Sequence, residues 1–297
     1  MKYLLMITTV IFLKIGDVNS ASTNNVFIIV IDGARYSETF GDESHRFIPK
    51  IWNELRPKGV IFTSFYNAGP TLTNPGHSAI LTGTRQDIAN DGSERPRQPT
   101  LFEYFRKQTG AAQNDCFVIL GKDKLDITAF SDHPDYGESY GAFVKPSAEP
   151  ESDLVTWENL RGIISTRHPR LVMVNLAETD IGGHSGNQQQ YTQALRQADS
   201  LVNELWRVVQ TDSFYANQTA LFITNDHGRH TRDFSGHGDG CEGCRHIMLL
   251  VIGPDTPAGL IDSNEYTQFD MAPTIGYLLG LDLPYAKGSV IKSAVTK

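Results

Sequence analysis

Positive charge is scarce in this sequence. The chain has 26 lysines and arginines against 34 aspartates and glutamates, which gives a formal net charge of −8 and an isoelectric point near 5.6. This acidic balance argues against a nucleic-acid backbone or an anionic membrane as the main partner. An anionic ligand would therefore have to be attracted by positive charge gathered locally.

Long hydrophobic runs are scarce as well. Residues 3–13 form an apolar run that is too short to span a bilayer, and no other segment approaches the roughly 18 apolar residues of a spanning helix. The positive charge of Lys2, this short run and the small residues at 18–21 predict a signal peptide over residues 1–20, although Lys14 shortens the run. We therefore expect an exported protein, periplasmic or secreted, without an integral membrane segment in the mature chain. An uncleaved tail is the alternative.

Cysteine is rare, with three residues in 297. Cys116 begins an apolar segment and is interpreted as a buried thiol. Cys241 and Cys244 lie in a glycine-rich loop, where export permits a disulfide that would staple the loop. Redox chemistry or metal binding by this pair is the other interpretation.

Repeats and long linkers are absent, and the composition is that of an ordinary globular protein. With 40% hydrophobic residues, the chain is long enough to bury a large core. No shift in composition marks a domain boundary. We therefore predict a single domain over residues 21–297.

Continuous apolar, β-branched segments recur along the chain, and the first is VFIIVI at residues 26–31. Such runs are typical of strands that are buried on both faces of a parallel sheet. Helical patterns separate them, including a capping box at Thr100 and Glu103. The alternation predicts an α/β fold, a three-layer sandwich with a mostly parallel central sheet between helices. The expected strands are 26–31, 60–66, 116–120, 171–176, 220–224 and 246–252, and the expected helices are 48–55, 100–108, 151–165, 191–209 and 270–279.

Metal-type ligands follow the carboxyl ends of three expected strands. In open α/β sheets, ligands bind beyond these ends. Mixed carboxylate and imidazole ligands suit zinc, and also manganese, iron or cobalt. Each residue alone has an ordinary interpretation as part of a turn, a helix or a surface loop, but the coincidence at several strand ends favours a metal centre. The candidates are Asp32, Asp180 with His184, Asp226 with His227, and His237 in the glycine-rich loop that follows.

The segment GPTLTNPGHSAILTG, residues 69–83, places a hydroxyl-rich turn before a short apolar stretch. Pro75 and Gly76 indicate a turn that opens a helix, and a helix N-terminus suits an anion. Thr73 at this junction would be a competent nucleophile if a bound metal ion lowers the pKa of its hydroxyl. The simpler interpretation is that Thr73 caps the helix.

The ordered motifs IDGAR, PTLTNPGHSAILTG, ETDIGGHSG, NDHG and GHG resemble the alkaline phosphatase superfamily. The similarity is greatest to its type I phosphodiesterase/nucleotide pyrophosphatase branch, and it covers residues 26–281. It implies an alkaline-phosphatase-like catalytic domain with two divalent metal ions, zinc or else manganese. It also implies hydrolysis of a small-molecule phosphate ester through a covalent phospho-threonine.

The resemblance implies a role for each matching residue. Thr73 would be the nucleophile. His77 belongs to the motif but would pack against or orient the nucleophile segment. Asp32, Thr73, Asp226 and His227 would hold one metal ion, and Asp180, His184 and His237 would hold the other.

Three further positions match more weakly. Asn90 falls where some members of the superfamily place an asparagine that donates to a phosphate oxygen. Lys122 and Lys124 resemble the Lys and Arg with which some phosphomonoesterases bind the extra charge of a monoester. Solvated loop charges are the alternative interpretation of the two lysines.

The sequence also departs from some branches of the superfamily. Sulfatases need a convertible Cys or Ser followed by an Arg, and the TNPGH segment at residues 73–77 has neither, which disfavours sulfate ester hydrolysis. A phosphonate or sulfate ester hydrolase on the same site is one alternative function. A non-catalytic protein that binds metal or phosphate is the other. The oligomeric state is left open.

Overall fold

The structure, a computed structural model, describes residues 22–147 and 152–296. The expected signal peptide over residues 1–20 lies outside the described residues. The strands are β1 (Asn25–Ile31), β2 (Gly59–Tyr66), β3 (Cys116–Ile119), β4 (Phe143–Lys145), β5 (Leu171–Leu176), β6 (Thr219–Thr224), β7 (His246–Ile252) and β8 (Leu260–Thr267). The α-helices are α1 (Thr73–Thr82), α2 (Leu101–Thr109), α3 (Asp153–Arg167), α4 (Glu178–His184), α5 (Gln188–Thr211), α6 (Glu242–Arg245) and α7 (Met271–Leu279).

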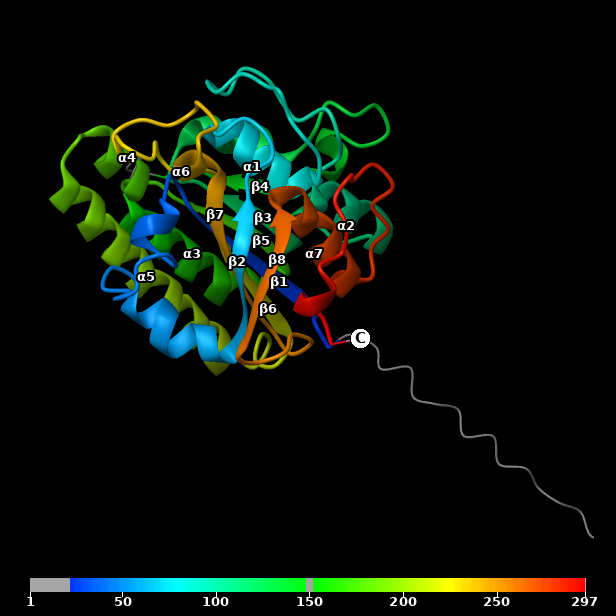
Figure 1. Cartoon of the computed structure of the whole chain (residues 1–297). Helices are drawn as coiled ribbons and strands as arrows, with labels where there is room; N and C mark the ends of the chain where they lie inside the picture. Colours follow the sequence, from blue (N-terminus) through cyan, green and yellow to red (C-terminus); the bar gives the residue numbers. More distant parts are fainter. Residues whose placement is uncertain (1–21, 148–151, 297) are drawn as a thin grey trace, which may run out of the picture.

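One eight-stranded sheet forms the centre of the molecule, in the order β4-β3-β5-β1-β6-β7-β2-β8 (Figure 1). Among the described strands, β7 alone runs antiparallel to its neighbours β6 and β2. The sheet is therefore mostly parallel, which confirms the predicted fold class. No helix within the described ranges is both long enough and apolar enough to cross a bilayer.

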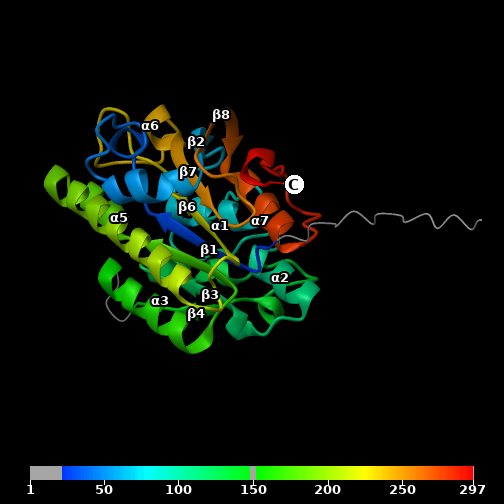
Figure 2. The same ribbon diagram turned by 90° about the horizontal axis from the view of Figure 1, so that it is seen from below.

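Helices cover both faces of the sheet. Figure 2 shows α3 and α5 on one side and α1, α2 and α7 on the other. In β1, Val26 and Ile28 belong to the core beneath α1, α2 and α7. Phe27 and Ile29 belong to the core beneath α3 and α5. Because both faces of β1 are buried, its sequence is continuously apolar instead of alternating.

The structure differs from the sequence-based expectations in two strands, in one expected helix and in the short helices α4 and α6, which were not predicted. The edge strands β4 and β8 were not predicted, because β4 has three residues and β8 is largely exposed and polar. The helix expected at 48–55 forms a π-helical turn, Ile51–Leu55, and then a 3-10 turn, Arg56–Lys58. Pro57 has no N–H to continue a regular helical ladder. The helix expected at 151–165 corresponds to α3, and residue 151 lies outside the described range.

The carboxyl ends of β1, β5 and β6 meet at one edge of the sheet, since the three strands are parallel neighbours. The segment after β1 carries Asp32, α4 follows β5 with Asp180, and Asp226 follows β6. The first turn of α1 packs against this edge. A Cβ on Gly76 would come within 2.8 Å of the carbonyl oxygen of Asp226, so a glycine permits the close approach.

Glu103 ties α2 to the segment that leads to β4. Its fully buried carboxylate accepts hydrogen bonds from the backbone N–H groups of Thr100 (2.7 Å), Ser131 (3.0 Å) and Gly137 (2.7 Å). It also accepts one from the Ser131 hydroxyl, at 2.7 Å. The capping interaction with Thr100 is the one predicted from the sequence.

We expect Glu103→Gln to lower the free energy of unfolding by about 2 kcal/mol, because an amide NH₂ would then face donors that need an acceptor. Chemical denaturation monitored by circular dichroism measures this change. Glu138→Gln is the control, since Glu138 is exposed in the same part of the chain, and its effect should stay within about 0.5 kcal/mol. Equal unfolding midpoints for the two variants would contradict the role given to Glu103.

Candidate active site

Thr73 is the first residue of α1 and is 1% exposed. Leu72 before it has an extended backbone, so the chain turns into the helix at this point. The backbone N–H of Asn74 in the first turn donates to Oδ1 of Asn90, at 2.9 Å. The side chain of Asn74 in turn donates to the backbone carbonyl of Lys124, at 2.8 Å. The predicted nucleophile therefore lies in a fixed helical turn at the carboxyl edge of the sheet.

Asp32 and Asp226 lie side by side at the ends of β1 and β6, and both are fully buried. One oxygen of each is bound: Asp32 Oδ2 by the side-chain amide of Asn175 (2.9 Å) and Asp226 Oδ1 by the N–H of Gly33 (3.1 Å). The other oxygens, Asp32 Oδ1 and Asp226 Oδ2, have no hydrogen-bond partner among the described residues. Burial, followed by the charge of Asp226, raises the pKa of Asp32 above its ordinary value.

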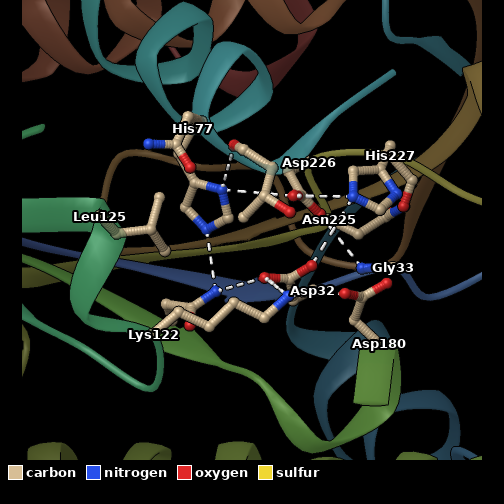
Figure 3. Close-up of polar contacts among 12 residues, drawn as sticks. Asp32, Gly33, His77, Lys122, Leu125, Asp180, Asn225, Asp226 and His227 are labelled. Atoms are coloured by element: carbon tan, nitrogen blue, oxygen red, sulfur yellow. Dashed lines mark hydrogen bonds and ion pairs between the residues drawn. The ribbon is translucent and has the colours of Figure 1, made fainter. Parts of the chain in front are cut away.

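His227 points a ring nitrogen at these two free oxygens (Figure 3). Its Nδ1 lies 2.9 Å from the carbonyl oxygen of Gly228 and must donate, since a carbonyl only accepts. In the neutral ring Nε2 then carries a lone pair, and it lies 3.3 Å from Asp226 Oδ2 and 3.7 Å from Asp32 Oδ1. Nε2 also has no hydrogen-bond partner in the described part of the chain. Three converging, buried acceptor atoms are costly without a cation, so this donor set fits a divalent metal ion.

Asp180, His184 and His237 form a second group of metal-type side chains next to the first. Nε2 of His237 lies 3.1 Å from Nε2 of His184 and 3.7 Å from Asp180 Oδ1. Its Nδ1 donates to the carbonyl oxygen of Thr71, at 2.9 Å. Burial and the neighbouring His227 lower the pKa of His237 to about 4, so its ring is neutral and suited to bind a metal ion.

His227 joins the two groups of ligands. Its ring stacks on that of His237 with centroids 3.9 Å apart. Two sets of three residues each bring one ligand atom per residue to within 4.8 Å of the others. One set is Asp180, His227 and His237, and the other is Asp32, Asp226 and His227. The structure thus brings the predicted carboxylate and imidazole side chains into two adjacent groups that share His227, and the predicted ligand role of Thr73 stays a prediction.

His77 connects the nucleophile segment to the buried carboxylates. Its Nδ1 donates to the carbonyl oxygen of Thr73 at 2.9 Å and lies 3.3 Å from Asp226 Oδ2. Its Nε2 accepts from the side-chain amide of Asn175, at 3.0 Å. Because that amide also binds Asp32, Asn175 fixes His77 and Asp32 together. Sequence reasoning missed Asn175, which looks like an isolated polar residue within a buried strand.

Lys122 and Lys124 occupy different positions. The Lys122 ammonium is buried between two proposed metal ligands, 2.6 Å from Asp180 Oδ2 and 3.0 Å from Asp32 Oδ2. Lys124 donates to the carbonyl oxygen of Asn90, at 2.9 Å, and is partly buried. Both lysines therefore face the site and its rim, and Lys122 is a direct partner of the ligand carboxylates.

Arg229 is a site residue that the sequence analysis did not identify. It is fully buried, its guanidinium lies 2.5 Å from Asp180 Oδ1, and it donates to the carbonyl oxygens of Phe234 and Ser235. A Cβ on Gly183 would lie 2.2 Å from the guanidinium carbon. Gly183 therefore leaves the space that the Arg229 side chain occupies, and no local sequence pattern signalled this contact.

The comparisons with known proteins agree with this geometry. The model of the Metalloenzyme superfamily matches residues 139–239. GPI ethanolamine phosphate transferase 1 of Candida glabrata is 24% identical over 89% of this chain and 33% of its own length. The chain thus spans about a third of the length of that relative. A 2,3-bisphosphoglycerate-independent phosphoglycerate mutase of Lawsonia intracellularis is 32% identical over 38% of this chain and 21% of its own.

Solved structures share the fold at low sequence identity. A phosphonate monoester hydrolase from Silicibacter pomeroyi superposes with a TM-score of 0.67 at 12% identity, covering 92% of this chain and 77% of that one. A mutant of the alkaline phosphatase PafA superposes with a TM-score of 0.69 at 12% identity, covering 91% of this chain and 98% of that one. Murine ectonucleotide pyrophosphatase/phosphodiesterase 5 superposes with a TM-score of 0.67 at 13% identity, covering 92% of this chain and 100% of that one. These structures show that the chain has the alkaline-phosphatase-like fold, and the family-model match shows that residues 139–239 are similar to the Metalloenzyme superfamily.

Proposed function

We propose that the protein is a metal-dependent hydrolase of small phosphate esters that acts through a phosphorylated Thr73. The observation that carries this proposal is the convergence of three buried, unpartnered acceptor atoms, from Asp32, Asp226 and His227, beside the first turn of α1. Such a set suits a metal centre, and His77 connects the backbone of Thr73 to it through Asp226. We propose export of the mature chain on the basis of residues 1–20.

The donor set fits two divalent ions, for which we propose zinc, or else manganese. When bound, the ions supply positive charge that neutralises the carboxylates and stabilises charge on the phosphoryl oxygens. We assign Asp32, Thr73, Asp226 and His227 to the first ion, and Asp180, His184 and His237 to the second.

In the proposed reaction, Thr73 Oγ1 forms a bond to phosphorus while the bond to the leaving alcohol oxygen breaks. The proton lost from Thr73 is balanced by the proton that the leaving alkoxide takes up. Water then attacks phosphorus, the bond to Thr73 breaks, and the threonine hydroxyl is restored. His77 holds the carbonyl of Thr73 and so fixes the direction of the nucleophile.

Asn90, Lys122 and Lys124 are proposed to bind the phosphoryl group. The Oδ1 of Asn90 accepts the N–H of Asn74 in the first turn of α1, and its Nδ2 has no hydrogen bond within the described residues, so Nδ2 is available to donate to a phosphate oxygen. The positive charges of Lys122 and Lys124 would favour a phosphate monoester over a diester. Donors directed at developing negative charge contribute on the order of 3 kcal/mol each to lowering the barrier.

Thr73→Ala is expected to lower kcat for an aryl phosphate ester by about 1000-fold or more, because the attacking oxygen is lost. Thr73→Ser retains a hydroxyl and should keep measurable turnover. Ser78→Ala is the matched control, since Ser78 is buried in the same helix and its Oγ binds no described residue. A phosphoryl group found on Thr73 by mass spectrometry after rapid quenching is the second readout.

The assay is run on an aryl phosphate monoester, an aryl phosphate diester and an aryl sulfate. A preference for the monoester supports the proposed phosphate-binding roles of Lys122 and Lys124, and a preference for the diester contradicts these roles. Full activity of Thr73→Ala would exclude Thr73 as the nucleophile. A protein that binds metal ions but turns over none of the esters would favour a binding function.

Exhaustive chelation is expected to abolish turnover and to lower the unfolding temperature. Without metal ions, Lys122 compensates only part of the negative charge of the buried Asp32 and Asp226 carboxylates. Bound metal stabilises the folded protein by about 2.7 kcal/mol when its concentration is 100 times Kd. Thermal unfolding and ester turnover are measured before and after zinc or manganese is returned. A chelator presaturated with zinc is the control. Activity that persists in protein shown to be free of metal would overturn the proposal.

A transferase activity is the second candidate, because the relative aligned over 89% of the chain is named an ethanolamine phosphate transferase. In that case an alcohol, in place of water, would take the group from Thr73. For a hydrolase acting on an aryl phosphoethanolamine diester, we expect the amount of free phosphoethanolamine to equal the amount of aryl alcohol released. This equality should hold at every glycerol concentration. A glycerol adduct that grows with glycerol concentration would instead establish transfer. Product ratios by ³¹P NMR measure the partition, and Thr73→Ala is the blank.

A further inference from the structure

A separate group of metal-type side chains lies in the segment between β6 and β7. It consists of His230, Asp239, Cys241 and Cys244, and one ligand atom from each lies within 4.8 Å of the others. None of the four belongs to the ligand sets around Asp32 and Asp180. Two of them are the cysteines whose role the sequence left open.

The sulfur–nitrogen distances within this group are close to those between the ligands of one tetrahedral zinc ion. Zinc bonds of about 2.3 Å to sulfur and about 2.1 Å to nitrogen place a sulfur and a nitrogen ligand about 3.6 Å apart. Nδ1 of His230 lies 3.5 Å from the sulfur of Cys244 and 3.9 Å from the sulfur of Cys241. The same nitrogen lies 2.9 Å from Asp239 Oδ1.

The local backbone holds these side chains in place. Cys241 precedes α6, and its carbonyl oxygen accepts the N–H groups of Cys244 and Arg245, at 3.0 and 2.9 Å. This single turn presents both sulfurs on one side, the usual arrangement of a Cys-x-x-Cys pair in zinc sites. The backbone N–H of His230 donates to the carbonyl of Gly236, at 2.8 Å, and the absence of a side chain on Gly236 leaves space for the His230 ring.

A disulfide between the cysteines explains less of the arrangement. The structure has Cys241 and Cys244 as free thiols. A disulfide would use the two sulfurs alone and would give no reason for His230 and Asp239 to converge on the same point. Zinc uses all four side chains, and thiolate ligands favour zinc over manganese, magnesium or calcium.

We propose that His230, Asp239, Cys241 and Cys244 bind one structural zinc ion, distinct from the catalytic metal centre. The ion would close the segment from residue 230 to residue 244 into a loop, and His237 lies inside that loop. His237 donates to the carbonyl oxygen of Thr71, and the N–H of Gly240 lies 3.4 Å from the Thr71 hydroxyl. The zinc ion would thus hold the loop against the segment that leads to Thr73. This consequence, though not the site itself, rests on the proposed function.

Cobalt substitution of the reduced, full-length chain tests the proposal. The two groups of ligands around Asp32 and Asp180 offer only oxygen and nitrogen atoms, so a cobalt–thiolate charge-transfer band reports on the loop site alone. We expect such a band with an amplitude of one site per chain in the unchanged protein and in Thr73→Ala. The Thr73→Ala spectrum separates failure of this proposal from failure of the proposed reaction.

The variants Cys241→Ser and Cys244→Ser should each lose the band and one equivalent of zinc. Cys116→Ala is the matched control, because Cys116 is a buried thiol on β3 and should keep both the band and the zinc content. Loss of the loop zinc is also expected to weaken metal binding at His237 by about 10- to 100-fold, measured as the zinc concentration needed to restore activity. The proposal is overturned by the absence of the band in the unchanged protein, or by a Cys241–Cys244 disulfide found in protein purified without reductant.

Discussion

The arrangement of this protein depends on a set of negative and lone-pair groups that cannot be buried together without a cation. Asp32, Asp226 and His227 are fully buried, and each directs an unpartnered acceptor atom at the same space. Burial removes the hydration that would otherwise compensate the two carboxylates. In the structure the ammonium of Lys122, which lies between Asp32 and Asp180, compensates part of the negative charge. The carboxylate oxygens nearest to His227, Asp32 Oδ1 and Asp226 Oδ2, are the ones available to bind a metal ion.

The fold supplies the rigid frame that such a site requires. Three parallel strands bring their carboxyl ends to one edge, so side chains distant in sequence arrive there without long loops. Hydrogen bonds then orient them: Asn175 holds Asp32 and His77 together, and His77 holds Thr73. On the other side of the site, the segment after β6 supplies His237. That segment is irregular and lacks a sheet to fix it, which gives a physical reason for a structural ion of its own.

The sequence predicted the regular core well and the edges poorly. Buried strands such as β1 have a continuous apolar pattern that few other structures produce, so all six predicted strands are present. β8 was missed because an exposed edge strand is polar and resembles a loop. In the site, Thr73 and His227 were identified through motifs. Arg229 and Asn175 were not, because their importance comes from contacts with Asp180 and with Asp32 that no local pattern reveals.

The sequence by itself determined the α/β class, the order of the strands along the chain and the types of side chain available for metal binding, because these follow from local periodicity and from short motifs. The tertiary structure alone decided which side chains meet. It placed Lys122 between two ligand carboxylates and brought His230 and Asp239 to the cysteine pair. Such contacts join residues far apart in the chain, and their geometry depends on the packing of the whole sheet and its loops.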